Sequence, residues 1–166
     1  MKRILTTRRL TLVPFQRADI NLLHETFTNA FVRRFLWDDQ LVTRDQTEEI
    51  LEKNEQYFQR AGWGLWKMLT GAIYVGFAGL WPFFDESQPQ LLFGLLPDYT
   101  KRGYAGEAAQ AVKDFAFGTL ELQYLIASCD APHVDSVRVC ERLGMRKTED
   151  RIIDGKLISF FRVDVK

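Results

Sequence analysis

The sequence has few cysteines, no excess charge of either sign and no long apolar run. Two cysteines, Cys129 and Cys140, are too few for a disulfide framework, so we expect a protein of a reducing, cytoplasmic environment. The 22 basic and 22 acidic residues cancel, which argues against a dedicated nucleic-acid-binding protein. The apolar stretch at residues 72–84 is interrupted by two glycines and a proline, and is shorter than the roughly 18 residues that a membrane span needs. The N-terminal residues become charged before any apolar core of signal-peptide length.

Metal-ligand patterns are also missing. His24 has no second histidine or cysteine one helical turn away, so we expect no metal site. With 166 residues, of which 46% are hydrophobic, the chain suits a single globular domain over residues 1–166. Phenylalanine, with 13 residues, dominates the aromatic content. This indicates a Phe-rich core, with the alternative that some of the aromatic side chains line a groove.

Hydrophobic periodicity predicts an α/β fold with a mixed sheet. We expect strands over residues 9–15, 63–69, 72–81, 90–96, 125–129, 146–153 and 156–165, and helices over residues 19–30, 43–59, 103–117 and 136–143. The three closely spaced strands between residues 63 and 96 predict an antiparallel meander. Thr43 and Gln46 have the spacing of a helix capping box. Asp154-Gly155 predicts a type I′ hairpin turn, and Pro14 suggests that the first strand lies at a sheet edge.

The most informative segment is PDYTKRGYAGEA at residues 97–108, where a strand ends and a helix begins. Its loop carries two cations, Lys101 and Arg102, and two glycines, Gly103 and Gly106. Glycine lets backbone N–H groups turn toward a ligand without a Cβ clash, and a helix N-terminus offers unpaired donors to an anion. The segment therefore predicts a phosphate site, although neither G-x-x-x-x-G-K-[ST] nor G-x-G-x-x-G is present. The alternative is a glycine-rich turn with solvated charges.

Three segments occur in a characteristic order. They are TRRLTLV at residues 7–13, the strand–loop–helix segment at residues 95–108, and SVRVCERLGM at residues 136–145. In this order and spacing they resemble the GNAT acetyltransferases, and within them the branch that contains the ribosomal-protein alanine N-acetyltransferases. The resemblance covers nearly the whole chain. It implies a GNAT-like mixed, mostly antiparallel central sheet, flanked by helices and splayed after the strand at residues 90–96 to hold acetyl-CoA.

The resemblance also implies an activity. It is acetyl-CoA-dependent N-acetyl transfer to a primary amine, either a protein N-terminus or a small molecule, with acetyl-CoA as co-substrate and no metal. Orientation of the two reactants and polarisation of the thioester carbonyl by backbone N–H groups would accelerate the transfer. The residues implied in acetyl-CoA binding are Leu95, Leu96, Lys101, Arg102, Gly103, Tyr104, Ala105, Gly106, His133 and Ser136.

Several positions depart from the family's pattern. Thr100 stands where the family usually has Gln, Arg or Trp, so Lys101 and Arg102 would supply the polar contacts of the loop. His133 stands in place of the Asn that contacts pantetheine. Cys140 stands in place of the general-acid Tyr found in many members. A thiol, with a reference pKa near 8.5, could reprotonate the CoA thiolate; the alternative is a small apolar residue on the inner helix face.

The general base is the least defined part of the predicted site. The position where branch members often carry an acid is Gln90, which cannot accept a proton. Asp85 or Glu86, in the preceding turn, could act as a base through water, unless both are solvated turn acids and no dedicated base exists. Ser136 fits the family serine beside the thioester sulfur, with an inert helix hydroxyl as the alternative. Glu107 is expected only to stabilise its helix N-terminus.

The sequence does not identify the acceptor amine. Residues 30–40, 81–89 and the final hairpin are the expected acceptor-contacting segments, and Asp38 and Asp39 would join Asp85 and Glu86 in attracting a cationic amine. Arg138 and Arg142 are expected either to meet the adenosine 3′-phosphate or to be solvated. Either a monomer or a homodimer is compatible with the sequence.

Two other functional classes compete with the enzyme. The first is a catalytically weak acyl-CoA-binding or regulatory domain on the same fold, which the replacements at Gln90, His133 and Cys140 suggest. The second is a protein-interaction module built on exposed tryptophans. These would be Trp37, Trp63, Trp66 and Trp81.

Overall fold

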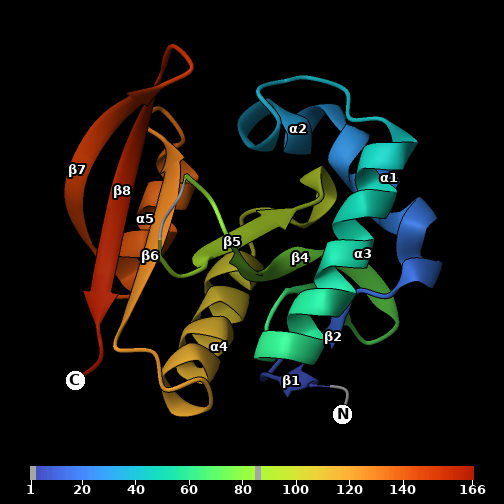
Figure 1. Ribbon diagram of the computed structural model, residues 1–166, viewed down its shortest axis with the longest axis horizontal. Helices are drawn as coiled ribbons and strands as arrows, with labels where there is room; N and C mark the ends of the chain where they lie inside the picture. The colour runs from blue at the N-terminus through green and yellow to red at the C-terminus, as the bar shows by residue number, and fades with distance from the viewer. Residues whose placement is uncertain (1–2, 85–86) are drawn as a thin grey trace.

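An eight-stranded sheet runs through the computed structural model, which describes residues 3–84 and 87–166 (Figure 1). The strands are β1 (Leu5–Thr6), β2 (Thr11–Pro14), β3 (Leu65–Thr70), β4 (Ile73–Trp81), β5 (Gln90–Leu95), β6 (Tyr124–Asp130), β7 (Arg146–Ile153) and β8 (Lys156–Asp164). The helices are α1 (Ile20–Thr28), α2 (Ala30–Leu36), α3 (Arg44–Ala61), α4 (Tyr104–Gly118) and α5 (Val134–Arg142), with 3-10 turns at Arg17–Asp19 and Pro97–Tyr99. The spatial order is β1-β2-β3-β4-β5-β6-β8-β7, and every neighbouring pair except β5–β6 is antiparallel.

The sheet opens at its centre. Gln90 pairs with Ile126 and Leu91 with Ala127, and β5 and β6 then continue for several residues without further pairing to each other in the described chain. The mixed, mostly antiparallel sheet that splays at its central strands is therefore confirmed. The divergence leaves one edge of β5 free of a strand partner beyond Leu91, between two halves of the molecule.

Helices cover both faces of the sheet and give it two hydrophobic cores. Side chains alternate between the faces along a strand: Leu65 of β3 packs under α1, α2 and α3, whereas its neighbour Trp66 packs under α4 and α5. Phe27 and Phe77 fill the first core, and Phe115 reaches the second. The predicted Phe-rich core is confirmed, and other phenylalanines line a cavity described below.

Short local sequence patterns determine where several elements begin and end. Thr43 caps α3 through the predicted capping box with Gln46, and Gly62 ends that helix with a left-handed φ of 77°. The turn between β7 and β8 has positive φ at both central residues, 50° at Asp154 and 79° at Gly155, as a type I′ turn requires. The antiparallel meander of β3, β4 and β5 is likewise confirmed.

The single helix predicted over residues 19–30 is wrong. The chain leaves the helix at Asn29, whose side-chain oxygen accepts hydrogen bonds from the N–H groups of Phe31 and Val32 and so starts α2. An asparagine inside an apolar pattern is compatible with one continuous helix or with a break between two helices. Here its capping hydrogen bonds stabilise the break. The separate α2 matters because it forms one wall of the cavity.

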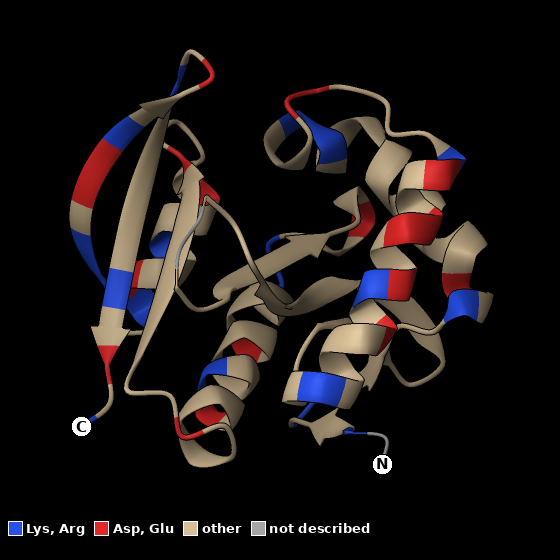
Figure 2. Cartoon of the chain, viewed as in Figure 1, with Lys and Arg blue, Asp and Glu red and all other residues tan. Residues whose placement is uncertain are grey.

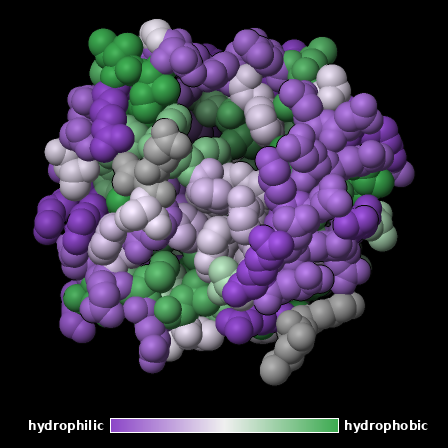
Figure 3. Space-filling view, viewed as in Figure 1, coloured by the Kyte–Doolittle hydropathy of each residue, from purple (hydrophilic) through white to green (hydrophobic). Residues whose placement is uncertain are grey.

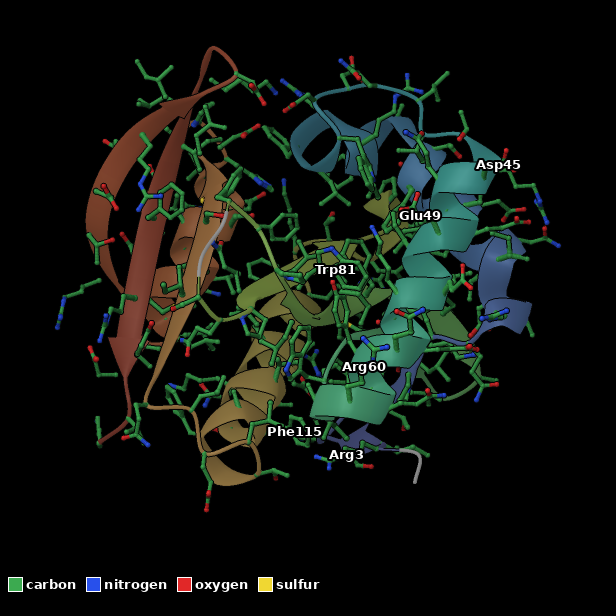
Figure 4. All side chains as sticks on the ribbon, in the orientation of Figure 1. Arg3, Asp45, Glu49, Arg60, Trp81 and Phe115 are labelled. Carbon is green, nitrogen blue, oxygen red and sulfur yellow. The ribbon has the colours of Figure 1, made fainter. Side chains whose placement is uncertain are left out.

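Two further expectations are corrected. β2 is not an edge strand, because the short β1 covers it; Pro14 is tolerated since β1 pairs only up to Leu12, at the other end of β2. The four tryptophans are not exposed: Trp66 is fully buried, and the others pack partly buried against the cores. Figure 4 shows Trp81 between the sheet and α3, where the centroid of its ring lies 5.1 Å from the centroid of the Tyr57 ring.

The two ends of the sheet differ in character. β1 is only two residues long and is tied down by Arg3, whose carbonyl accepts a hydrogen bond from Trp66 and whose guanidinium lies over Phe115 (Figure 4). β7 is long and mostly exposed, and it carries a basic, an acidic and a second basic block in succession before it ends in two isoleucines (Figure 2). Its pairing with β8 shifts register between Lys147 and Glu149. Over the described residues, no helix combines the length and apolar character needed to cross a bilayer.

Candidate functional site

A cavity of about 580 Å³ occupies the opening between β5 and β6. Its walls come from α2, the diverging ends of β5 and β6, the loop before α4, α5 and the hairpin β7–β8. Figure 3 shows a hollow between the hairpin tip and α2, with hydrophobic residues inside it and hydrophilic residues around it. The size lies within the usual range for small-molecule sites.

One end of the cavity is cationic. Lys101 and Gly103 line it from the loop before α4, Gly106 from the first turn of α4, and Arg138 and Arg142 from α5. Lys101 and Gly103 both have left-handed backbone, with φ of 62° and 83°, which turns the loop back toward the start of the helix. The first bond of α4 runs from the N–H of residue 107 to the carbonyl of Gly103, so the three preceding N–H groups lack an intrahelical partner. Free donors, a helix dipole and three cations together suit phosphate.

Glu107 holds this loop in place. Its Oε1 accepts hydrogen bonds from Thr7 Oγ1 at 2.6 Å and the Arg9 backbone N–H at 2.8 Å, and its Oε2 pairs with Arg9 Nε at 2.7 Å. Arg9 also donates to the carbonyl oxygen of Arg102 at 2.8 Å. Partial burial opposes the charge of Glu107, but the bonds from Thr7 and Arg9 outweigh it and lower the pKa of the carboxyl. The network ties the loop to the turn between β1 and β2, a role beyond the dipole effect expected from the sequence.

His133 and Ser136 form a hydrogen-bonded pair on the cavity wall. Ser136 Oγ lies 2.8 Å from His133 Nδ1. The imidazole stacks on Phe35 of α2, with ring centroids 4.0 Å apart and planes 8° from parallel. Burial lowers the pKa of His133, against the opposing charges of Asp135 and Asp130, so the ring is neutral at neutral pH. Ser136 Oγ also lies 3.4 Å from His133 Nε2, so the shorter contact to Nδ1 is the main one, and the stack on Phe35 holds the ring in this orientation.

Gln90 lies at the point where the strands separate. It is 0% exposed and accepts a hydrogen bond from Ser128 Oγ at 2.7 Å, and Ser128 itself lines the cavity. Gln90 Nε2 has no hydrogen-bond partner among the described residues. The amide therefore orients Ser128 on the cavity wall.

The opposite end of the cavity is aromatic and holds an ion cluster. The phenylalanines there come from α2 and from the segment after β4, and they are Phe31, Phe35, Phe83 and Phe84. Lys156, the first residue of β8, lies with its Nζ 2.8 Å from Asp38 Oδ1 and 3.5 Å from Asp130 Oδ2. Asp38 follows α2 and Asp130 ends β6, so this cluster joins the two halves of the molecule across the opening.

The structure brings together most of the residues predicted from the sequence. Those that line the cavity are Leu95, Lys101, Gly103, Ala105, Gly106, His133 and Ser136, joined by Arg138, Arg142 and Asp38. Leu96, Arg102 and Tyr104 are not among the lining residues: Leu96 packs in the core under α1–α3, and Tyr104 lies against Arg9. Asp39 is also outside the wall and pairs with Arg33. Asp85 and Glu86 lie outside the described residues.

Cys140 lies behind the cavity wall. It is 1% exposed within the core under α4 and α5, and burial raises the pKa of its thiol to about 12. The thiol is therefore protonated, as a proton donor must be, but it is not among the residues that line the cavity. Cys129 of β6 does line it, with a pKa that burial raises to about 11.

Sequence reasoning missed the functional position of Phe35, Asp130 and Lys156. All three expected acceptor segments do contribute to the wall, through Phe35 and Asp38, through Phe83, and through Lys156. No local pattern marks these side chains, because they meet only when the hairpin folds against the end of α2.

Comparison with known proteins gives one consistent family. The model of the acetyltransferase (GNAT) domain matches residues 9–146. An uncharacterized N-acetyltransferase, YnaD of Bacillus subtilis, is 25% identical over 143 residues, covering 86% of this chain and 82% of that protein. The crystal structure of an acetyltransferase from Agrobacterium tumefaciens is 26% identical, with a TM-score of 0.82 over 98% of this chain and 95% of that chain.

A third relative is similar in fold alone. RimL, a ribosomal L7/L12 α-N-protein acetyltransferase, was solved in complex with CoA, which forms a disulfide with one of its cysteines. It is 13% identical to this chain and has a TM-score of 0.84 over 98% of both chains.

Proposed function

Because this chain belongs to the GNAT acetyltransferase family, whose members carry out acyl-CoA-dependent N-acetyl transfer, we propose that it acetylates a primary amine with acetyl-CoA. The observation that carries the proposal is the cavity in the opened sheet, with a phosphate-type loop at one end and a carboxylate-bearing, aromatic end at the other. The arrangement suits two reactants that enter from opposite ends and meet between β5 and β6.

The cationic end fits the charged part of acetyl-CoA. We assign the pyrophosphate to residues 101–106, where the free N–H groups of α4 and Lys101 converge, and the 3′-phosphate to Arg138 and Arg142. A Cβ placed on Gly106 would meet no atom within 4 Å, so the backbone there is open to a ligand. The free edge of β5 is left for the pantetheine arm. The complex of RimL with CoA, in the same fold, supports this assignment.

Acetyl transfer requires a proton to move from the acceptor nitrogen to the departing sulfur. When bound, acetyl-CoA supplies the thioester whose acetyl group is transferred. We assign the proton transfer to His133 and Ser136: neutral His133 accepts the amine proton at Nε2 and gives its Nδ1 proton to Ser136 Oγ. Ser136 passes its hydroxyl proton to the sulfur. An acceptor that arrives as an ammonium first loses one proton to solvent and becomes a neutral amine. The relay then carries one further proton from the nitrogen to the sulfur, and both side chains end neutral, with the imidazole in its other tautomer.

Cys140 is the second candidate for the last proton transfer. Its raised pKa keeps the thiol protonated, but its burial separates it from the cavity. Ser136 lies on the wall, next to the proton acceptor, and we therefore rank it first. Asp85 or Glu86, which the sequence suggests as a base acting through water, is the alternative to His133 as proton acceptor.

The test combines binding and turnover. Calorimetry should show acetyl-CoA binding, and a thiol-reactive dye should report CoA release when amines of different classes, including peptides with free N-termini, are added. Product masses should increase by one acetyl group. Binding without release for any acceptor would favour the acyl-CoA-binding domain, and absence of acetyl-CoA binding would refute the proposed function.

A further inference from the structure

The aromatic end of the cavity contains an ammonium site that the protein fills with its own lysine. We propose that the acceptor is a primary amine carried on a flat apolar group, and that its ammonium replaces Lys156 Nζ between Asp38 and Asp130. The proposal rests on the proposed N-acetyltransferase function and names the substrate class of that site.

The first argument is the geometry of the ion cluster. Two carboxylates from different halves of the molecule converge on one ammonium, at 2.8 Å from Asp38 and 3.5 Å from Asp130. Asp130 is only 8% exposed, and a buried carboxylate needs a cation beside it. The hydrogen bond to Asp38 raises the pKa of Lys156, the direction expected for an ammonium beside carboxylates.

The second argument is that Lys156 can leave. It stands directly after the hairpin turn, on a flexible four-carbon stem, and its side chain is 39% exposed. Its ammonium can therefore move into water at small cost, whereas an acceptor ammonium that enters finds both carboxylates already in position. Lys156 then acts as an internal competitor of the acceptor.

The third argument is the chemistry of the surrounding wall. Phe31 is 45% exposed and Phe84 is 41% exposed, and both line the same cavity, where one ligand would cover them together. Together with Phe35 and Phe83 they provide ring faces and edges for a flat apolar group. A second cation or a hydroxyl-rich chain would instead lose hydration against these rings.

The site also adjoins the proposed proton acceptor. The backbone N–H of His133 donates to the carbonyl of Asp130 at 2.8 Å, so Asp130 and His133 are the first and last residues of one turn. An amine held at Asp130 would lie beside the pair that takes its proton.

The decisive variant is Lys156→Gln. If Lys156 competes with the acceptor, the KM for 2-phenylethylamine should fall about fivefold, the factor expected for losing a partly exposed ion pair. Asp38→Asn should raise the KM for 2-phenylethylamine. In Asp38→Asn/Lys156→Gln, the KM should no longer be lower than that of wild type. Lys147→Gln is the matched control, because Lys147 lies on the same hairpin, pairs with Asp150 and does not line the cavity. An unchanged or raised KM in Lys156→Gln would overturn the proposal.

The apolar group is tested by a matched series of acceptors. The kcat/KM for 2-phenylethylamine should exceed the values for ethanolamine and putrescine by about tenfold or more, the factor that one methylene or more in an apolar pocket supplies. Phe31→Ser should reduce the difference in kcat/KM between 2-phenylethylamine and the two polar amines. Equal rates for ethanolamine would overturn the substrate class.

Failure of the enzyme function would be distinguished by binding alone. If no acceptor releases CoA, the proposed function fails, but calorimetry of 2-phenylethylamine still measures the ammonium site. Tighter binding to Lys156→Gln than to wild type would support the site, and equal or weaker binding would refute it.

Discussion

Gly106→Val should separate acetyl-CoA binding from folding. Gly106 lies in the first turn of α4 and lines the cavity, and a Cβ there would meet no atom within 4 Å. The protein itself therefore has room for valine, and the space that the side chain fills is the space assigned to the pyrophosphate.

The expected magnitudes differ between the two properties. Valine is a slightly better helix former than glycine, by about 0.3 kcal/mol, so the melting temperature should change by only about 1 °C. Displacing a phosphate from one backbone N–H removes a charge-assisted hydrogen bond worth about 1.5–3 kcal/mol. The Kd for acetyl-CoA should therefore rise by about tenfold or more.

Calorimetry and thermal unfolding of three variants make the test. Gly118→Val is the matched control, since Gly118 ends the same helix in open space and does not line the cavity. Gly103→Val should weaken binding at least as much, but should also destabilise the fold, because Gly103 has a φ of 83° and a Cβ would lie 3.2 Å from Arg9 Nη2. Wild-type affinity in Gly106→Val would refute the placement of the pyrophosphate.

The remaining predictions concern protons and charge. His133→Gln and Ser136→Ala should each lower kcat by about 10²-fold with little change in the Kd for acetyl-CoA; wild-type kcat should fall as the pH drops through the lowered pKa of His133, and this acid limb should be absent in His133→Gln. Cys140→Ala should keep kcat within about threefold if Ser136 is the donor, whereas a 10²-fold loss in a folded variant would assign the role to the thiol. In urea unfolding, the free energy of unfolding of Cys140→Ala should depend less on alkaline pH than that of wild type. The thiol has a pKa of about 12 in the folded state and 9.0 in the unfolded state, so the unfolded state loses the proton first. Wild-type stability therefore falls as the pH rises above 9.0. Glu107→Gln should weaken acetyl-CoA binding several-fold by freeing the loop from Arg9; since the folded pKa of Glu107 is lowered, its stabilisation is present above pH 4.5 and is lost as the pH falls through the folded value, which acid unfolding of the two proteins would show. The KM for a cationic acceptor should rise with salt in wild type and less so in Asp38→Asn, in steady-state kinetics at several ionic strengths.

Local chemistry explains how much of the fold the sequence predicts. A capping box at Thr43, a glycine after α3 and an Asp-Gly turn each act over a few residues, and each appears where its pattern stands. Asn29 is the exception, because an apolar stripe continues through it and only the capping bonds reveal the break. Hydrophobic periodicity over residues 19–30 is therefore compatible with one helix or with two.

The site was predictable where it is local and not where it is assembled. The loop at residues 101–106 is continuous in sequence, and all six of its residues were expected to bind acetyl-CoA. Four of them line the cavity: Lys101, Gly103, Ala105 and Gly106. The cluster of Asp38 with Lys156 depends on a contact between the first half of the chain and the last strand. The burial of Cys140 likewise depends on how α5 packs, which residue type does not reveal.

The charged outer strand β7 affects how the protein behaves at high concentration. An exposed strand edge is a template for fibril growth, and charged side chains and irregular pairing counteract it. β7 carries both devices, with the register shift between Lys147 and Glu149 and charged residues of both signs between Arg146 and Arg151, while β1 at the other edge is too short to recruit a strand. Concentrated solutions should therefore remain free of amyloid-like aggregates, and any self-association must use the helical faces rather than continuous β-ladders.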